Sequence, residues 1–312
     1  MKSKKITAIL VGCGRFGFGG NLEKTSKFSY YYFLKKKKII DLLALIEPNP
    51  TTVLLKTGNA IFKNLNPLEK KKIDIAYVVS STESHFSVLK KISELSPSLI
   101  VAEKPLTESF EKSQEILKLI KKKQKKIIVN FSRRFIDFYH RIKKDLINQK
   151  IISFTIKYGK GLRNNGYHAI DLFNFFLGKL IYINPLCKKN DFSRNDNTQT
   201  VFLKYEKCSQ VFLVSLDHRY FTHFEIEIFT DKKKYLISGN ETCYISNVKN
   251  EKKENFFSKP KVLKINHKSH INNLIDYSID VFKQKKIGNI KNIIEVEKVL
   301  KLIESYEVEN KN

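Results

Sequence analysis

The sequence predicts an α/β protein with two domains: first a doubly wound parallel sheet, then an α/β domain with a largely antiparallel, open sheet. Three observations predict this fold class. An apolar stretch, Ile6–Val11, runs directly into the glycine pattern Gly12-x-Gly14-x-x-Gly17. Apolar strands then alternate with helical patterns as far as residue 129, which indicates parallel βα units. Beyond residue 150, short strands follow one another across turns, which is typical of an antiparallel sheet. The predicted domains are 1–128 and 129–288, and residues 289–312 form a last helix that packs back on the first domain.

Each glycine of the segment GCGRFG at 12–17 has a mechanical reason to be there. Gly12 makes the tight turn, Gly14 lets the backbone approach a pyrophosphate, and Gly17 lets a helix pack closely on the strand. The N–H groups beyond the turn face the anion. The motif alone is a weak signal that an ordinary glycine-rich loop also gives, but its place after an N-terminal apolar strand favours a dinucleotide-binding Rossmann domain. We expect Arg15 and Phe16 of the same turn to contact the cofactor.

A carboxylate, Glu47, ends the second apolar strand just before Pro48. A carboxylate in this place accepts hydrogen bonds from both hydroxyls of a ribose, although its distance from Gly17 exceeds the usual ~20 residues. Alternatively, Glu47 is only a solvent-exposed carboxylate at the end of a strand. Because Glu47 would repel a 2′-phosphate and no arginine follows it directly, we expect NAD as cofactor, with NADP less favoured.

The remaining elements follow in order along the chain. The first crossover helix is delayed by an insertion and lies in SYYYFLKKKK at 29–38. An amphipathic helix follows the segment Ser81–Ser84 and runs to Leu95, and other helices are predicted at Thr107–Lys123 and Ile136–Ile147. The further strands of the first domain are Ile39–Glu47, Ile73–Ser80, Leu99–Ala102 and Ile127–Val129. The strands of the second domain are Ile151–Lys157, Thr200–Tyr205, Gln210–Leu216, Phe224–Phe229, Lys234–Ile237 and Thr242–Val248, with helices at Tyr167–Leu177 and Ile271–Phe282. The last helix of the chain, Ile293–Tyr306, belongs to the segment that packs back on the first domain.

Composition sets the broad class of the protein. The net charge of +27 permits a polyanion-binding reading, yet the lysines occur in short runs throughout the 312 residues and form no single stripe. We expect no specific nucleic-acid partner, and the charge favours anionic substrates by steering them. No stretch approaches the ~20 apolar residues of a membrane-spanning helix, so no membrane insertion is expected. The first 13 residues also resemble a lipoprotein signal, but their apolar run is shorter than the required ~7 to 15 residues.

The four cysteines lie far apart, without a CxxC pair or clustered histidines. This spacing argues against a metal site and against a disulfide framework, and it predicts a cytoplasmic protein.

With these elements in place, the chain resembles, over nearly its full length, the family of glucose-fructose oxidoreductase, inositol dehydrogenase and MocA (Gfo/Idh/MocA). The segments that carry the resemblance are GCGRFG at 12–17, AEKPL at 102–106, NFSRRF at 130–135 and NNGYHAIDL at 164–172. Each is modest alone, and their order and spacing make the match specific. The resemblance implies hydride transfer between a sugar or polyol and a bound nicotinamide. It also implies a second domain whose sheet supports a homodimer or homotetramer.

The resemblance assigns Lys104 of the EKP segment to the reacting oxygen. An ammonium there stabilises the charge that develops as hydride leaves carbon. A fixed peptide is expected at Lys104–Pro105, with the cis form as one option. Further cofactor contacts are expected at Ser80, Ser81, His85 and Glu103.

His168 matches the family's histidine on the substrate side and is the candidate for proton transfer, work that suits an imidazole near neutral pH. At the start of a helix, we expect the N-terminal dipole to hold it neutral. The position four residues earlier is commonly Asp in the family and is Asn164 here, which can orient His168 or hold a substrate hydroxyl but cannot act as a base. Tyr167 is a further expected substrate contact. Arg134 either binds an anionic part of the substrate or braces the domain junction. Asp171 is expected to be structural, with a substrate-side role as the minority reading.

The leading functional hypothesis is an NAD-dependent oxidoreductase acting on a sugar or nucleotide sugar, with surface-polysaccharide synthesis suggested by family analogy alone. The alternative is a dinucleotide-binding protein that has lost catalysis and serves as a sensor or assembly partner. Lys104 and His168 favour the enzyme, and Asn164 slightly favours the alternative.

Overall fold

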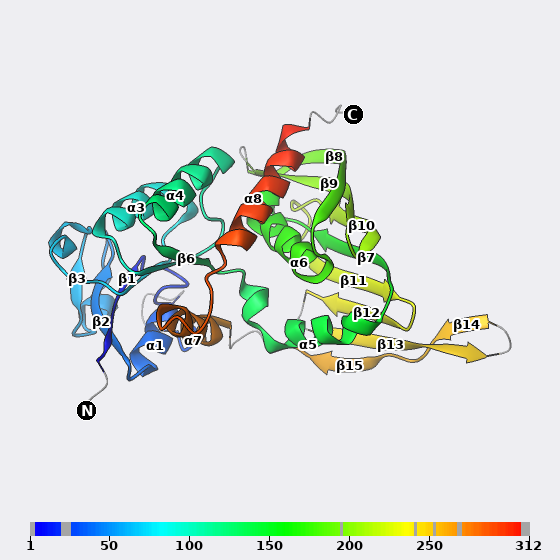
Figure 1. The fold of residues 1–312 in the computed structure, drawn as a ribbon, viewed down its shortest axis with the longest axis horizontal. Helices are drawn as coiled ribbons and strands as arrows, with labels where there is room; N and C mark the ends of the chain where they lie inside the picture. The colour runs from blue at the N-terminus through cyan, green and yellow to red at the C-terminus, as the bar shows by residue number, and fades with distance from the viewer. Residues whose placement is uncertain are drawn as a thin grey trace. The chain divides into compact units, whose positions relative to one another are not determined.

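The computed structural model describes residues 4–19, 26–193, 196–239, 242–251, 254–266 and 270–306. The chain divides into two compact units, shown as a ribbon in Figure 1. The first, here the cofactor unit, contains Met1–Phe135 and Lys268–Ile293. The second, here the substrate unit, contains Ile136–His267 and Ile294–Asn312. The predicted insertion after Gly19 lies partly outside the described residues.

The cofactor unit is built on a six-stranded, all-parallel sheet, which confirms the predicted doubly wound class. Its strand order is β3-β2-β1-β4-β5-β6. The strands are β1 (Ile6–Val11), β2 (Ile40–Ile46), β3 (Ala60–Phe62), β4 (Ile75–Val78), β5 (Leu99–Ala102) and β6 (Lys126–Val129). The order turns back at β1, so the chain crosses from β3 over to β4 beside it. A ligand of such a sheet binds outside the carboxyl ends of the strands at this reversal.

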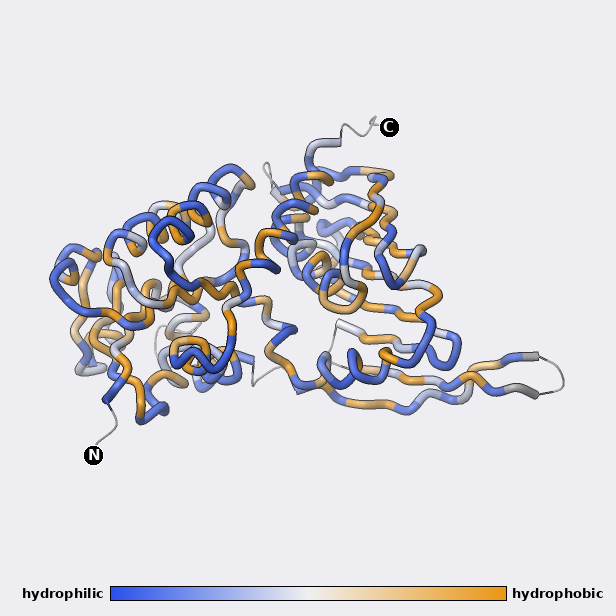
Figure 2. The backbone as a smooth tube through the Cα atoms, viewed as in Figure 1, coloured by the Kyte–Doolittle hydropathy of each residue, from blue (hydrophilic) through white to orange (hydrophobic). Residues whose placement is uncertain are grey.

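Two pairs of helices flank this sheet (Figure 1). One pair is α3 (Thr82–Leu95) and α4 (Phe110–Lys122), whose N-cap Ser109 accepts a hydrogen bond from the N–H of Lys112. The other is α1 (Tyr30–Lys36) with α7 (His270–Phe282). Apolar side chains of α1 and α7 share one buried cluster with the strands. Apolar residues follow the strands, and hydrophilic ones cover much of α3 and α4 (Figure 2).

The helix that returns to the cofactor unit is α7, whereas the sequence assigned that role to the last helix. The hydroxyls of Tyr77 on β4 and Ser278 on α7 lie 2.7 Å apart in a hydrogen bond. The last helix is present as α8 (Ile290–Ser305), but from Ile294 onward it clusters with the substrate unit. Both helices carry broad apolar faces, so the sequence pattern alone could not tell which one covers the sheet. The first unit ends at 135 and not at the predicted 128, and the chain returns to it over 268–293, whereas the return was predicted from 289 onward.

A short helix, α2 (Thr52–Leu55), and β3 in the cofactor unit were not predicted. The three residues of β3 form an edge strand that is only partly buried, so they lack the continuous apolar run by which the other strands are recognised.

The substrate unit is built on a nine-stranded sheet of order β14-β13-β12-β11-β7-β10-β9-β8, with β15 paired to β13. Only β7 and β10 pair in parallel, so the predicted largely antiparallel sheet is confirmed. The strands are β7 (Ile151–Tyr158), β8 (Leu180–Ser193), β9 (Asp196–Tyr205), β10 (Cys208–Ser215), β11 (Phe224–Thr230), β12 (Lys233–Ser238), β13 (Thr242–Glu251), β14 (Glu254–Phe257) and β15 (Lys261–Lys264).

One face of this sheet is covered by α6 (Tyr167–Leu177), whose bounds match the predicted helix. The rings of Phe154 on β7 and Phe173 on α6 meet edge to face at 5.3 Å. A further helix of this unit, α5 (Asp137–Asp145), lies where a helix was predicted. Alternate residues along β7 are buried, as expected of a strand with one covered face. The edge strand β8 was not predicted, because Pro185 and several polar residues interrupt its pattern, which an edge strand tolerates.

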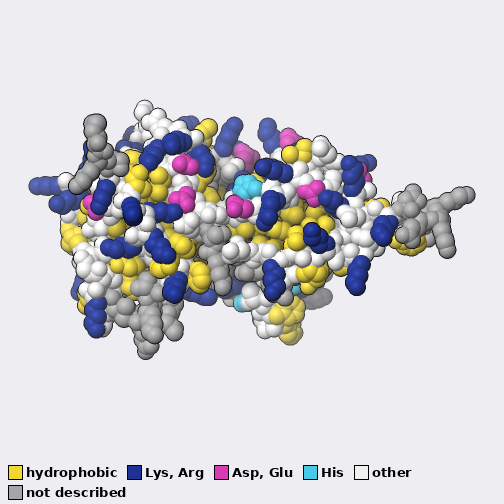
Figure 3. Space-filling model, turned by 90° about the horizontal axis from the view of Figure 1, so that it is seen from below, with side chains coloured by type: hydrophobic (Ala, Val, Ile, Leu, Met, Phe, Trp, Pro, Cys, Tyr) yellow, Lys and Arg dark blue, Asp and Glu magenta, His cyan; other side chains and the backbone are white. Residues whose placement is uncertain are grey.

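Lysine and arginine side chains are spread among apolar and uncharged ones on the face shown in Figure 3. In the part of the chain that the structure describes, no helix is long and apolar enough to cross a membrane. The same residues contain no group of three His, Cys, Asp or Glu side chains placed to hold a metal ion.

Candidate dinucleotide and substrate sites

The glycine turn follows β1 and is shaped by the close approach of other backbone. Gly12 has φ +89°, and a Cβ there would lie 2.5 Å from the backbone nitrogen of Ser80. A Cβ at Gly17 would lie 2.1 Å from the carbonyl oxygen of Gly12. At Gly14 an added Cβ would meet no described protein atom within 4 Å. Gly12 and Gly17 are therefore required by packing, while the space at Gly14 fits the approach of a dinucleotide pyrophosphate.

Glu47 lies beside this turn, at the end of β2, as the sequence predicts for a ribose-binding carboxylate. Its Oε2 accepts a hydrogen bond of 2.9 Å from the N–H of Cys13, and its Oε1 accepts one of 3.2 Å from the N–H of Asn49. A carboxylate has further acceptor positions, so these bonds leave capacity for ribose hydroxyls. Burial, followed by the charge of Glu47, raises the pKa of the Cys13 thiol to about 12. Cys13 is therefore a neutral filler of the turn, as expected.

His85 is buried on α3 and bridges two backbone segments. Its Nε2 lies 2.9 Å from the carbonyl oxygen of Ser80, and its Nδ1 lies 2.9 Å from that of Pro105. A neutral ring can donate to only one of these carbonyls, and a protonated ring to both. Because the side chain is only 1% exposed, His85 ties the segment after β4 to the EKP segment, and a direct contact with the cofactor is not favoured. Ser80 and Ser81 remain more accessible, at the entrance of α3.

Glu103, also expected to contact the cofactor, is held by two neighbours. Its Oε1 accepts hydrogen bonds of 2.7 Å from the Tyr30 hydroxyl and of 2.7 Å from the Asn130 amide. Burial, followed by the charge of Glu103, raises the pKa of Tyr30 well above its usual range. Glu103 thus anchors the EKP segment to α1 and to the end of β6, and Tyr30 and Asn130 are functional neighbours that sequence reasoning missed.

Lys104 follows this anchored residue and is partly exposed, with a cis peptide to Pro105, the form named as one option. Arg134 lies in a short 3-10 turn, Ser132–Phe135, and is also partly exposed. In the glycine turn, Arg15 stands over the ring of Phe16, with 5.8 Å between the guanidinium carbon and the ring centroid. Phe16 is 54% exposed, so it is accessible to a ligand.

In the substrate unit, a six-residue π-helical segment, Gly161–Gly166, leads directly into α6. Most side chains of this stretch are buried, whereas Asn164, Asn165 and His168 are partly exposed. π-helical turns are frequent at functional sites. Because the helical segment begins at Gly161, His168 does not lie at the first turn of a free helix, and the expected dipole effect on its ring is correspondingly weaker.

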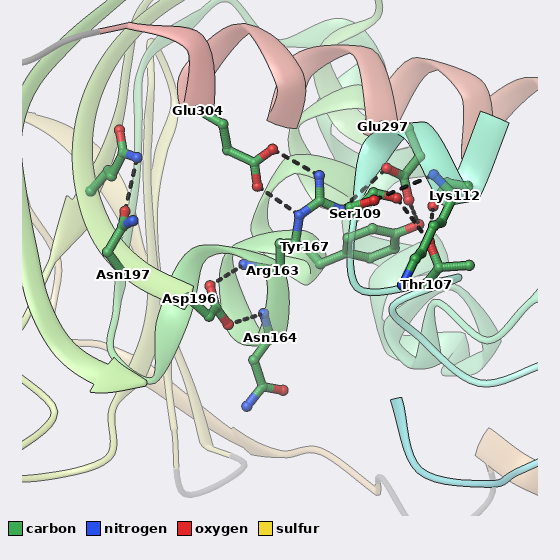
Figure 4. Close-up of polar contacts among 12 residues, drawn as sticks. Thr107, Ser109, Lys112, Arg163, Asn164, Tyr167, Asp196, Asn197, Glu297 and Glu304 are labelled. Carbon is green, nitrogen blue, oxygen red and sulfur yellow. Dashed lines mark hydrogen bonds and ion pairs between the residues drawn. The ribbon is translucent and has the colours of Figure 1, made fainter. Parts of the chain in front are cut away.

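Arg163 of the π-helical segment forms a buried ion cluster with α8 (Figure 4). Its Nε and Nη2 donate to the two carboxylate oxygens of Glu304 at 2.6 and 2.8 Å, and its Nη1 donates to Glu297 at 3.4 Å. The side chain of Glu297 is fully buried, and that of Arg163 is 7% exposed. Burial opposes the charge of Arg163, but the bond and charge of Glu304, then those of Glu297, outweigh it and raise the pKa.

Tyr167, expected to contact substrate, belongs to this cluster instead. Its ring is fully buried, and its hydroxyl donates to Oε1 of Glu297 at 2.9 Å. Asp171 is 1% exposed, in agreement with its expected structural role. The face of this segment that a ligand can reach therefore carries Asn164, Asn165 and His168.

Asp196, at the start of β9, holds the backbone that carries Asn164. Its Oδ1 accepts from the N–H of Arg163 at 2.8 Å, and its Oδ2 accepts from the N–H of Asn164 at 3.0 Å. In Figure 4 the side-chain amide of Asn164 points away from Asp196. No sequence pattern marks Asp196, Glu297 or Glu304, since each lies more than thirty residues from the residues that it contacts.

The structure thus gathers the predicted residues in two groups, one in each unit. The cofactor unit brings together the glycine turn, Glu47 and Ser80 through the bonds and close approaches given above, with His85 linking Ser80 to the EKP segment. The substrate unit places Asn164 and His168 on consecutive helical turns.

The comparison with known families decides the identity of the cofactor unit. Residues 6–131 match the family model GFO_IDH_MocA, described as an oxidoreductase family with an NAD-binding Rossmann fold. The cofactor unit belongs to the Gfo/Idh/MocA oxidoreductase family. The resemblance inferred from the four sequence segments is confirmed in this part of the chain. No curated protein sequence matches the chain.

Solved structures extend the Gfo/Idh/MocA likeness to the fold of both units. A dehydrogenase (MviM) from Clostridium difficile has a TM-score of 0.73 at 19% identity, covering 97% of this chain and 100% of that one. A myo-inositol dehydrogenase from Corynebacterium glutamicum has a TM-score of 0.71 at 15% identity, covering 96% and 95%. An oxidoreductase from Agrobacterium radiobacter, solved with NAD⁺, L-tartaric acid and magnesium, has a TM-score of 0.69 at 12% identity, covering 96% and 95%. At these identities the likeness concerns the fold.

Proposed function

We propose that the protein is an NAD-dependent oxidoreductase that transfers hydride between a sugar or nucleotide-sugar hydroxyl and the nicotinamide. The observation that carries the proposal is the open space at Gly14 beside Glu47, in a unit of the Gfo/Idh/MocA family. Glu47 would bind the ribose hydroxyls and disfavour a 2′-phosphate. The Agrobacterium structure named above holds NAD⁺ together with a hydroxy acid, which supports the cofactor and a hydroxyl substrate.

The roles of the side chains follow from their chemistry. A bound nicotinamide supplies the hydride acceptor or donor. Lys104 stabilises the negative charge that develops on the reacting oxygen, and His168 accepts or returns the hydroxyl proton. Asn164 orients the imidazole or holds a neighbouring hydroxyl, because an amide can do both without changing its protonation. Arg134, partly exposed and cationic, binds an anionic part of the substrate, which suits a nucleotide sugar.

The test is a turnover screen on the purified wild-type protein. NAD⁺ or NADP⁺ is mixed with panels of free sugars and nucleotide sugars, and nicotinamide absorbance is followed, with NAD affinity measured in parallel. We expect reduction of NAD⁺ by at least one member of the panels. Tight NAD binding without turnover would favour the alternative, a dinucleotide-binding sensor or assembly protein, for which the substitution of the family's Asp by Asn164 is the supporting observation.

We also propose that the protein forms a homodimer or homotetramer through the sheet face opposite α6. This face carries an aromatic row in which the rings of Phe202 and Phe212 lie 5.2 Å apart and those of Tyr182 and Phe202 lie 6.3 Å apart. Tyr182 is 47% exposed in the chain alone. Light scattering should show an oligomer that Phe202→Glu dissociates, while the matched change Phe221→Glu, on an exposed loop, leaves it intact. A monomeric wild type would contradict the proposal.

A further inference from the structure

We propose that Asp196 is a positioning residue: its ionised carboxylate fixes the backbone at Arg163 and Asn164, and so sets the direction of the Asn164 amide and the pH range of turnover. The inference rests on the proposed function, because it assigns Asn164 to the substrate. It concerns a residue that touches neither substrate nor cofactor and acts through the main chain of its neighbour.

The geometry shows a turn built around this carboxylate. Both oxygens are used, one by the N–H of Arg163 at 2.8 Å and the other by the N–H of Asn164 at 3.0 Å. Gly161 has φ +79°, and a Cβ there would lie 2.1 Å from Oδ2 of Asp196. Only glycine therefore lets the π-helical segment close around the carboxylate. The Asn164 side chain points away from this bond (Figure 4), so fixing its N–H fixes the direction in which its amide leaves the chain.

The ion cluster on the other side of the turn restrains the same residue. The side chain of Arg163 is bound by Glu304 and Glu297, while its N–H is bound by Asp196. Restraint of one residue at both backbone and side chain leaves the segment little freedom to rotate. The family's Asp is Asn164 in this chain, yet a carboxylate is present beside residue 164, supplied by β9.

Protonation of Asp196 disrupts this arrangement. An ionised carboxylate accepts at both oxygens, but a protonated one turns an O–H towards one of the two N–H donors, so one hydrogen bond is lost. Burial is the largest influence on this group, and it raises the pKa from 3.8 to about 6 against the lowering effect of the two N–H donors. Of the charged groups that face it, Arg163 lowers the pKa and Glu304 raises it. The hydroxyl of Tyr158 on β7 is a further titratable group beside Asp196, and Asp191 and Cys187 on β8 lie near that hydroxyl.

The direct test is amide hydrogen exchange of the full-length protein, followed by mass spectrometry or NMR between about pH 5 and pH 8 and corrected for intrinsic exchange. In the wild type, protection of one of the two amides, that of Arg163 or that of Asn164, should fall about tenfold on going below pH 6, as expected for loss of a bond to a charged group. Asp196→Asn should show weaker protection of one amide that no longer varies with pH. The matched control Asp191→Asn should keep the wild-type transition, because Asp191 instead accepts from Thr198 and His218. A transition that persists in Asp196→Asn would overturn the proposal.

The second readout is the pH–rate profile with a substrate found in the screen. Protonation of Asp196 should lower kcat about tenfold, so the wild-type profile should show a step near pH 6 that the profile of Asp196→Asn lacks. The variant should lose about tenfold in kcat at neutral pH, with NAD affinity unchanged. An unaltered profile would overturn the positioning role. If the exchange transition follows Asp196 but no sugar reduces NAD⁺, the anchoring stands and the proposed function fails.

Discussion

The two units hold their candidate site residues in place by different means. The cofactor unit uses backbone: Gly12 and Gly17 pack against main-chain atoms, Gly14 borders open space, and the carboxylate of Glu47 binds main-chain nitrogens. The substrate unit uses side-chain charge: a buried arginine, two glutamates and an aspartate fix a short helical segment from distant parts of the chain. A backbone site tolerates change in most side chains. A charge-anchored site fails when one member is removed.

The largest effect is expected where this contrast is strongest, at Arg163. Arg163→Met leaves the fully buried Glu297 without its cation, and removing one partner of a buried pair typically costs about 3–5 kcal/mol. Urea unfolding followed by circular dichroism measures the loss. The matched control is Arg219→Met, since Arg219 forms a similar two-pronged pair with Asp217 but is 68% exposed, and its removal should leave the midpoint unchanged. Equal effects of both changes would show that burial does not distinguish the two pairs.

Lys104→Ala should bind NAD normally but lose turnover by about 100-fold, the usual cost of removing one donor that stabilises developing charge. Steady-state kinetics and a cofactor titration separate the two quantities. Lys90→Ala, which removes an exposed lysine paired with Glu115, serves as control and should turn over normally. Turnover near wild type in Lys104→Ala would place the active site elsewhere.

Two substitutions in the glycine turn separate packing from ligand space. Gly12→Ala forces a Cβ to within 2.5 Å of the Ser80 backbone at φ +89°, and it should destabilise the fold by roughly 1–3 kcal/mol. Gly14→Ala meets no described protein atom, so it should leave stability unchanged yet weaken NAD binding at least tenfold. Unfolding curves and NAD titrations of both variants are the measurements. Normal NAD binding by Gly14→Ala would mean that the pyrophosphate lies elsewhere.

Ionisation of Asp196 should lower the free energy of unfolding, although the ionised form favours turnover. Because folding raises its pKa from 3.8 to about 6, its contribution to stability is fully present below about pH 4 and is lost as the pH rises through about 6. The shift corresponds to about 3 kcal/mol at most, and partial exposure reduces it to about 1–2 kcal/mol. The stability of wild type relative to Asp196→Asn should therefore fall over this range in unfolding experiments. If the stability difference between the two proteins does not vary with pH, the pKa of Asp196 is not raised in the folded state.

The smallest effect concerns the choice of cofactor. Glu47→Gln keeps an acceptor for the N–H of Cys13 but removes the charge that repels a 2′-phosphate. The affinity for NADP relative to that for NAD should rise by about fivefold to tenfold, as expected for a like-charge repulsion of about 1 kcal/mol in a solvated site. Fluorescence titration of both cofactors measures the ratio, and a wild type that prefers NADP would remove Glu47 from this role.

The cofactor unit was predictable from sequence because its information is local. Sequence position alone predicts the strand before Gly12, the turn formed by the glycines and the carboxylate at the end of β2. The substrate unit was predictable only in part: α6 and most strands follow from periodicity, and the NNGYHAIDL segment marks Asn164 and His168. Tertiary contacts determine the burial of Tyr167 and the anchoring roles of Asp196, Glu297 and Glu304. None of these residues lies in a sequence pattern that indicates its contact partner.

The late position of α7 in the chain has a consequence for how the protein is made. The parallel sheet is complete by residue 129, but one of its faces includes apolar side chains that pack with Ile271, Leu274 and Ile275 of α7. During synthesis this face stays exposed until α7 has left the ribosome. Its apolar surface can form non-native contacts until then. The substrate unit waits as well, since Glu297 and Glu304 come later still. A nascent chain that has not yet reached residue 304 would therefore lack residues that complete the packing of both units.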